Sequence, residues 1–174
     1  MATLEIKKYP DAVLKEKAEP VKEFDDLLQR LIDDMIETMY AAPGLGLAAN
    51  QVGVLKQVLI IDVGTDEEEE AEESSLMVLV NPEIVLEEGK HESEEGCLSI
   101  PDYTTIVKRF EKVKVKCLDR HGEPCEIEGE GLLAKALQHE IDHLNGILFV
   151  DRIGRIKREF FKKRYAREHP QDKE

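Results

Sequence analysis

The stretch 132–144, LLAKALQHEIDHL, restricts the possible folds of this chain more than any other. Its apolar residues recur at helical spacing, and Asn145-Gly146 is a typical helix end. The apolar stripe consists of Leu132, Leu133, Ala136, Leu137, Ile141 and Leu144. It would also bury His139, Glu140 and His143, which is costly unless these groups find partners. We therefore expect a buried helix that carries a polar site.

Two histidines four residues apart are neighbours on a helix, so His139 and His143 can offer ring nitrogens to one metal ion. Glu140 flanks the same face and is placed to exchange a proton with a water rather than to bind the ion. The alternative is a chance pattern of core histidines, but such a pattern is uncommon by chance. The sequence therefore predicts a metal site, which two ligands do not complete.

The third ligand is less well defined by the sequence. Zinc proteases with this type of helix usually take it from downstream, where the chain offers only poor donors in or beyond a basic tail: His169, Glu159, Glu168 and Glu174. Upstream, Cys97 in EEGCLSIP would complete a two-histidine, one-cysteine set with a fourth position open, as in catalytic sites. Cys117 is in phase with the apolar face of a predicted strand, and Cys125 follows a predicted turn. Spacing favours Cys97 and leaves these two thiols as alternatives.

The remaining patterns predict one α+β domain over residues 1–174. An amphipathic helix is expected at 25–41, ended by Pro43-Gly44. Strands are expected at 54–63, 75–88, 104–110 and 111–119, and His121-Gly122 marks a hairpin turn before 123–129. We expect antiparallel strands packed around a central metal-binding helix, with a basic C-terminal helix at about 153–168.

The charge balance bears on possible partners. A formal net charge of −14 argues against DNA or RNA as the main partner, and the acidic stretch 66–73 is expected to be a solvated loop. No apolar run is long enough to span a bilayer, and the start MATLEIKKYP has no signal-peptide core or transit-peptide composition. The three cysteines lack the regular spacing of a disulfide framework, which is consistent with a reducing compartment. We therefore expect a cytoplasmic protein without a membrane partner.

Three stretches resemble, in order and in relative spacing, the signature motifs of bacterial-type peptide deformylases. They are GLGLAANQ at 44–51, EGCLS at 95–99 and HEIDH at 139–143. The resemblance covers nearly the whole chain, from YPD near the start to LFVDR after the predicted metal-binding helix. It implies an enzyme that removes the formyl group from the N-terminal formyl-methionine of new polypeptides and releases formate.

The resemblance also implies the roles of individual residues. Cys97, His139 and His143 would bind one divalent metal ion, iron(II) in cells, which nickel, cobalt or zinc can replace. Glu140 would be the catalytic acid–base. Gln51 and the backbone N–H of Leu98 would donate hydrogen bonds to the oxyanion.

The resemblance further implies a substrate pocket for an unbranched methionine side chain. Its predicted members are Gly44, Leu45, Gly46, Leu132 and Ala136. The glycines lack side chains, so an extended substrate can approach the backbone closely and pair with it. Ser93 stands where an apolar lining residue is expected, and Thr104 where well-known members place a substrate-contacting arginine. Both departures affect the expected fine specificity and leave the chemistry unchanged.

The basic tail, residues 152–167, has a charge opposite to that of the whole chain. A solvated helix face is one interpretation, and the resemblance implies another, docking to the ribosome through phosphate contacts.

Two different functions of the whole protein remain as alternatives. A zinc endoprotease of the HExxH type would need a downstream third ligand. A catalytically silent binder of nascent chains would be expected to lack Glu140, a metal ligand or Gln51.

Overall fold

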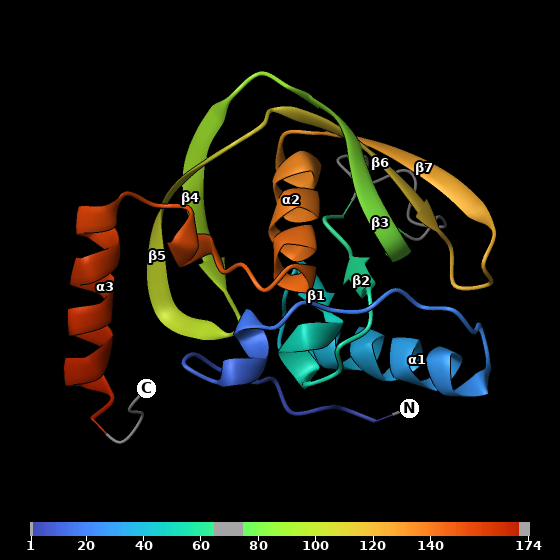
Figure 1. Ribbon diagram of the computed structural model, residues 1–174, viewed down its shortest axis with the longest axis horizontal. Helices are drawn as coiled ribbons and strands as arrows, with labels where there is room; N and C mark the ends of the chain where they lie inside the picture. The colour runs from blue at the N-terminus through green and yellow to red at the C-terminus, as the bar shows by residue number, and fades with distance from the viewer. Residues whose placement is uncertain (1, 65–74, 171–174) are drawn as a thin grey trace.

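The computed structural model describes residues 2–64 and 75–170 (Figure 1). The predicted α+β class, with antiparallel strands around a central helix and a C-terminal helix, is confirmed. The acidic stretch 66–73 lies outside the described residues. Within the described ranges, no helix combines the length and apolar character needed to cross a membrane.

Two antiparallel sheets form the framework. The larger has five strands in the order β1 (Gly46–Ala48), β2 (Val58–Ile61), β3 (Met77–Glu88), β6 (Lys112–Leu118) and β7 (Pro124–Glu130). The smaller pairs β4 (His91–Cys97) with β5 (Ile100–Arg109). Short 3-10 helices lie at Ala12–Lys15, Ala49–Val52 and Phe149–Asp151.

Helix α2 (Leu132–Leu144) lies in the middle of the molecule, between the two-stranded sheet and the five-stranded sheet (Figure 1). The predicted bounds and the helix end at Asn145-Gly146 are confirmed. Its apolar side packs against β1, β2 and β6 in one core cluster, while residues 138–144 are all buried. Because both sheets cover it, this helix buries its charged residues as well as its apolar ones.

Helix α1 (Asp26–Ala41) covers another part of the sheet, as the 25–41 pattern predicted. The Asp25 side chain accepts a hydrogen bond from the Leu28 N–H and so caps the first turn. Leu28 and Met35 are fully buried against β1 and β2, whereas Leu27 is 66% exposed. Together α1 and α2 hold the β1–β2 edge of the sheet between two apolar layers.

The sequence did not predict β4, because HESEEGC is polar and lacks the apolar alternation of a typical strand. Strand β5 also begins earlier than expected, and β2 is shorter than 54–63. A two-residue turn, Leu98-Ser99, joins β4 to β5. This hairpin carries the EGCLS motif to the face of α2.

Helix α3 (Arg155–Glu168) lies at the edge of the molecule, beside β5 (Figure 1). Its Phe161 and Tyr165 pack against Tyr9 and Phe149, and the Tyr165 hydroxyl donates to the Tyr9 carbonyl. Most of its other side chains face solvent. The helix is therefore fixed by a narrow apolar face and presents the rest of its surface outward.

Candidate metal and catalytic site

Three potential metal ligands come together on α2 and at the end of β4. Cys97, His139 and His143 each offer a ligand atom, and these atoms all lie within 4.8 Å of one another. Cys97 Sγ lies 3.3 Å from His143 Nε2. Bonds of about 2.0–2.3 Å to a metal ion require only small shifts to bring the three atoms together around it. A thiolate with two imidazoles is a donor set that both zinc and iron(II) accept.

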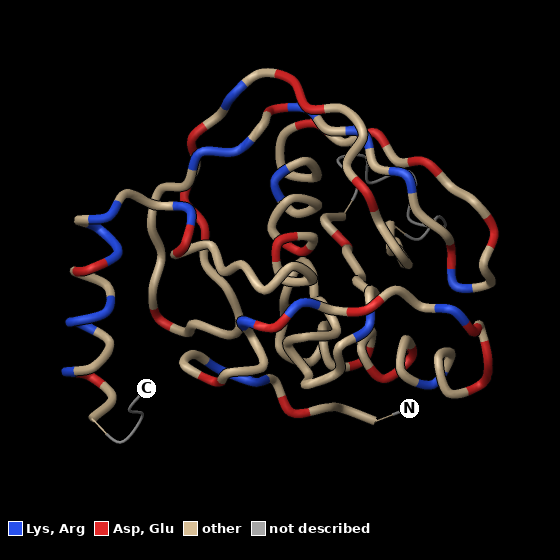
Figure 2. The backbone as a smooth tube through the Cα atoms, viewed as in Figure 1, with Lys and Arg blue, Asp and Glu red and all other residues tan. Residues whose placement is uncertain are grey.

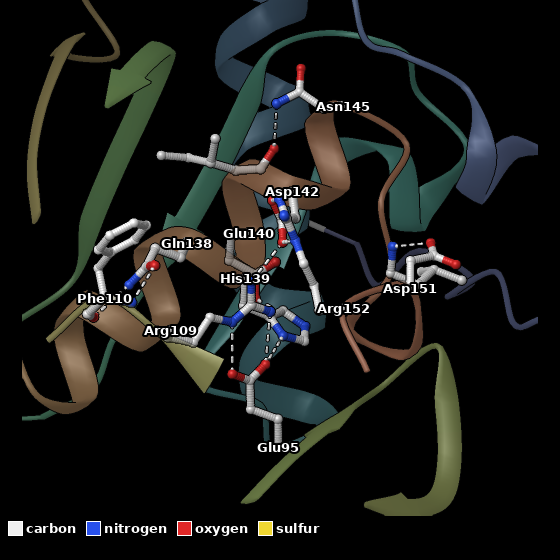
Figure 3. Close-up of polar contacts among 12 residues, drawn as sticks. Glu95, Arg109, Phe110, Gln138, His139, Glu140, Asp142, Asn145, Asp151 and Arg152 are labelled. Atoms are coloured by element: carbon white, nitrogen blue, oxygen red, sulfur yellow. Dashed lines mark hydrogen bonds and ion pairs between the residues drawn. The ribbon is translucent and has the colours of Figure 1, made fainter. Parts of the chain in front are cut away.

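A buried chain of ion pairs fixes His139 (Figure 3). His139 Nδ1 lies 3.0 Å from Glu95 Oε1, which leaves Nε2 to face the ligand group. Arg109 donates to both oxygens of Glu95 at 2.8 and 2.9 Å and to Asp142 at 2.6 Å. Asp142 in turn accepts two hydrogen bonds from Arg152. Such outer partners fix the orientation of a metal-binding imidazole.

The same contacts explain the protonation states of these buried side chains. Burial opposes ionisation of Glu95, but hydrogen bonds from Arg109 and His139 prevail and lower its pKa to about 2. Burial also opposes the charge on His139, yet its bonds to Cys97 and Glu95 raise its pKa well above the usual value. Burial, with the charges of His139 and Arg109, keeps the pKa of His143 well below its usual value. His143 is therefore neutral, as a ligand must be.

Glu140 is held in a water-poor position beside these ligands. It is 5% exposed, and burial raises its pKa to about 7 despite the nearby charges of His139 and Arg109. Its Oε1 atom is buried and has no hydrogen-bond partner within the described part of the chain. A Cβ on Gly46 would lie 2.8 Å from Glu140 Oε2, so a side chain at position 46 would displace the carboxylate from its present position. Glu140 is thus a buried carboxyl group whose pKa lies near neutral pH and whose Oε1 atom has no partner among the described residues.

Gln51 is placed at the site by the 3-10 helix that follows β1. Its side chain is 1% exposed and accepts the Ala48 N–H at 3.0 Å. Its amide nitrogen donates to Ser99 Oγ at 3.1 Å and approaches Cys97 Sγ at 3.6 Å. Leu98, the other predicted oxyanion donor, lies in the adjoining β4–β5 turn. The two predicted donors therefore border the same space.

A cavity of about 530 Å³ opens onto these residues. The predicted site residues along its walls are Gly44, Leu45, Gly46, Gln51, Cys97, Leu98, Leu132, Ala136, His139 and Glu140. His143 lies behind them, fully buried. Thr104 lines the cavity, whereas Ser93 does not. All three motifs thus contribute to one pocket that reaches from the surface to the ligand group.

The alternative ligands lie elsewhere. Cys117 and Cys125 face each other across β6 and β7, outside the ligand group formed among residues 2–64 and 75–170. The prediction that Cys117 belongs to the core is confirmed, since it is 6% exposed. Glu159 and Glu168 lie on α3, and His169 follows it, stacked on Tyr165. Among residues 2–64 and 75–170, no downstream ligand of the kind that a zinc endoprotease would need joins the group; Glu174 lies outside the described residues.

The sequence reasoning missed four residues that support the site: Glu95, Arg109, Asp142 and Arg152. Glu95 was considered only as part of a motif, because β4 was not predicted. Residues two apart on a strand share a face, so the strand would have placed Glu95 beside Cys97. Asp142 carried a signal of its own, a carboxylate three residues after His139 on a helix predicted to be buried. No local pattern marked the two arginines.

Comparison with known proteins agrees with this geometry. The family described as polypeptide deformylase matches residues 3–159. A peptide deformylase of Thermodesulfovibrio yellowstonii is 59% identical over 165 residues, which cover 95% of this chain and 98% of that protein. One from Syntrophobacter fumaroxidans is 50% identical, with 96% of each chain covered.

Solved structures show the same likeness. The crystal structure of a peptide deformylase from Legionella pneumophila superimposes with a TM-score of 0.86 at 48% identity, covering 99% of each chain. That of peptide deformylase from Ehrlichia chaffeensis in complex with actinonin gives a TM-score of 0.88 at 40% identity, covering 97% of this chain and 98% of that one. Sequence and fold therefore point to the same family.

Proposed function

The chain belongs to the peptide deformylase family and is a metal-dependent hydrolase that removes the N-formyl group from nascent polypeptides. From this we propose that Cys97, His139 and His143 hold its metal ion. The observation that carries this assignment is the meeting of three distant motifs at one buried ligand group. The unpartnered oxygen of Glu140 beside that group supports it, because a buried carboxylate without a partner is costly unless a ligand satisfies it.

The ion would be iron(II) in cells, with nickel, cobalt or zinc as replacements. When bound, it would supply Lewis acidity and lower the pKa of a water from about 15.7 towards about 7. The protein's part is to orient both imidazoles toward the ion, beside the Cys97 sulfur. The hydrogen bond from His139 Nδ1 to Glu95 does this for one imidazole, since it leaves the other nitrogen free to bind.

Glu140 would transfer the protons of the reaction. Its carboxylate accepts a proton from the attacking water and later delivers it to the leaving amine, which would otherwise depart as an unstable anion. A pKa of about 7 suits both steps near neutral pH, because the group is neither a strong acid nor a strong base. Burial raises the pKa of Glu140 to this value, so the buried position of its carboxylate against Gly46 contributes to proton transfer.

Gln51 and Leu98 would stabilise the charge that grows on the formyl oxygen. The Gln51 amide group donates to Ser99 Oγ in the absence of substrate and is held there by the Ala48 N–H on its oxygen. A substrate oxygen in the pocket would compete for the amide nitrogen and would also accept a hydrogen bond from the N–H of Leu98, which lines the same pocket. Both donors are fixed before substrate arrives, which is what makes them effective.

The substrate chain would bind along β1. This strand is at the edge of the five-stranded sheet, and its Gly46 lines the pocket beside Gly44. An extended peptide can therefore add to the sheet edge through its backbone. Leu45, Leu132 and Ala136 would then enclose the methionine side chain, since they belong to the apolar lining of the same cavity.

Formate release from formyl-Met-Ala-Ser tests the assignment. Wild type and Glu140→Gln are prepared without air, loaded with nickel and compared at equal metal content. We expect release by wild type and near-complete loss in the variant, with metal content retained. Acetyl-Met-Ala-Ser and an unformylated internal peptide are the matched controls. Cleavage of the internal peptide would favour the endoprotease, and no release by metal-loaded wild type would favour the silent binder.

We also propose that α3 docks on the ribosome, which would place the protein in the bacterial cytoplasm. Figure 2 shows that the helix is rich in basic residues in a chain of net charge −14. Lys157, Lys162 and Lys163 on it are exposed and can contact phosphates. A separate groove of about 940 Å³ runs between α3 and the two-stranded sheet and is lined by further cations.

Neutralising the helix is a sharper test than deleting it, because α3 buries Phe161 and Tyr165 in the core. The triple change Lys157→Gln, Lys162→Gln and Lys163→Gln should weaken binding to ribosomes, most visibly at low salt, with unchanged turnover of a formyl peptide. The matched control replaces three exposed lysines outside α3: Lys17, Lys22 and Lys56. Equal weakening by both sets would refute specific docking.

A further inference from the structure

The deformylase chemistry makes no use of a second pair of thiols, Cys117 on β6 and Cys125 on β7. The two residues are direct partners in the antiparallel ladder, and their Sγ atoms are 2.6 Å apart. Both are free thiols. Directly paired residues have Cα atoms about 4.5–5.5 Å apart, within the roughly 4.4–6.8 Å that a disulfide spans. The backbone therefore already has the spacing that a disulfide needs.

The surroundings hold this spacing. The β6–β7 turn is closed by a hydrogen bond from the Asp119 N–H to the Glu123 carbonyl. The Asp119 side chain also accepts the N–H groups of His121 and Glu123. Cys117 is buried in the core between the sheet and α2, and Cys125 packs at its margin with partial exposure. The Cys125 thiol is thus reachable from solvent, whereas the Cys117 thiol beside it is buried.

We propose that Cys117 and Cys125 form a reversible cross-strand disulfide, closed by hydrogen peroxide and opened by small thiols. The Cys125 thiolate attacks one peroxide oxygen, so the O–O bond breaks, hydroxide leaves and a sulfenic acid forms. The Cys117 sulfur then attacks the Cys125 sulfur, and the S–O bond breaks. The Cys117 proton and the departing hydroxide form water. Overall, two thiols lose two hydrogens and peroxide is reduced to two waters.

The order of the two steps follows from exposure. Peroxide reaches Cys125 first, because Cys117 is only 6% exposed. Burial, together with the neighbouring Cys125, raises the pKa of the Cys117 thiol, which keeps it protonated and inert toward peroxide. Disulfides in reducing compartments are commonly transient and redox-sensing, and this pair has the geometry for that role. The inference is independent of the assignments made for the metal site.

Peptide mapping can test the inference without ambiguity, because trypsin separates the three cysteines. Cleavage after lysine and arginine places Cys117 in residues 117–120, Cys125 in 121–135 and Cys97 in 91–108. The folded, metal-loaded enzyme is treated with peroxide, its free thiols are alkylated and the digest is read by mass spectrometry. We expect peptide 117–120 linked to 121–135 in monomeric protein, and separation of the two by dithiothreitol.

Single-cysteine variants test the order of the steps. With a sulfenic-acid trap present, Cys117→Ser should be labelled at Cys125, whereas Cys125→Ser should give little label at Cys117. Neither variant should form the link, and both should keep wild-type turnover. Absence of the linked peptide at a peroxide dose that oxidises other residues would overturn the inference. A link found only between two chains would overturn it as well.

Discussion

Removal of the Arg109 side chain tests whether the buried charge chain supports the fold as the distances imply. Arg109 is 5% exposed at its side chain and makes three hydrogen bonds of 2.6–2.9 Å to Glu95 and Asp142. In Arg109→Leu, Asp142 keeps Arg152, but Glu95 keeps only His139. A buried carboxylate would thus lose its main counter-charge. Removing one partner of a buried pair typically costs about 3–5 kcal/mol.

The matched control is Arg152→Leu. Arg152 contacts the same Asp142, but its side chain is 45% exposed and Asp142 would keep Arg109. We expect this change to cost about 0–1 kcal/mol, as for a solvent-screened pair. The comparison separates loss of a charge from loss of a buried counter-charge, because each variant removes one arginine from the same chain.

Urea unfolding of both variants gives the answer. The protein is first stripped of metal, because a ligand that binds only the folded state adds to the apparent stability. With a slope of about 2 kcal/mol per molar urea, Arg109→Leu should lower the midpoint by about 1.5–2.5 M. Its metal affinity should also fall, by about 10- to 100-fold, because Glu95 would orient His139 less firmly. A loss below about 1 kcal/mol, or an equal loss in Arg152→Leu, would refute the argument.

Three further changes test the site and its support. Gln51→Ala should reduce turnover about 10²- to 10³-fold through loss of an oxyanion donor. It should also cost about 1–3 kcal/mol of stability because the buried Ala48 N–H loses its partner, so kinetics and urea unfolding are both needed. Gly46→Ala should displace the Glu140 carboxylate and cost about 10²-fold in turnover with metal content unchanged, and normal turnover would contradict this. Gly146→Ala should lower the melting temperature, because Gly146 has φ of 75° and a Cβ there would clash with the Lys15 carbonyl oxygen. An unchanged melting temperature would contradict the close packing.

The helices could be predicted from the sequence because their signals are local. The periodicity of α1 and α2 and the turns that end them lie within single stretches of chain. The same holds for His139, Glu140 and His143, whose helical spacing places them on adjoining positions. Strand β4 could not be predicted in this way, since its polar residues are stabilised by pairing with β5 rather than by an apolar face of their own.

The sequence by itself determined the kind of chemistry, because residue types and their spacing within each motif already select a metal and an acid–base group. Spacing favoured Cys97 over Cys117 and Cys125, and the family resemblance implied it as a ligand. Only the tertiary structure shows Cys97 beside the two histidines and the other two thiols facing each other across a hairpin. It also supplied Arg109, which no motif contains. The physical reason is that burial and counter-charge arise between segments distant in sequence, so they exist only once the chain has folded.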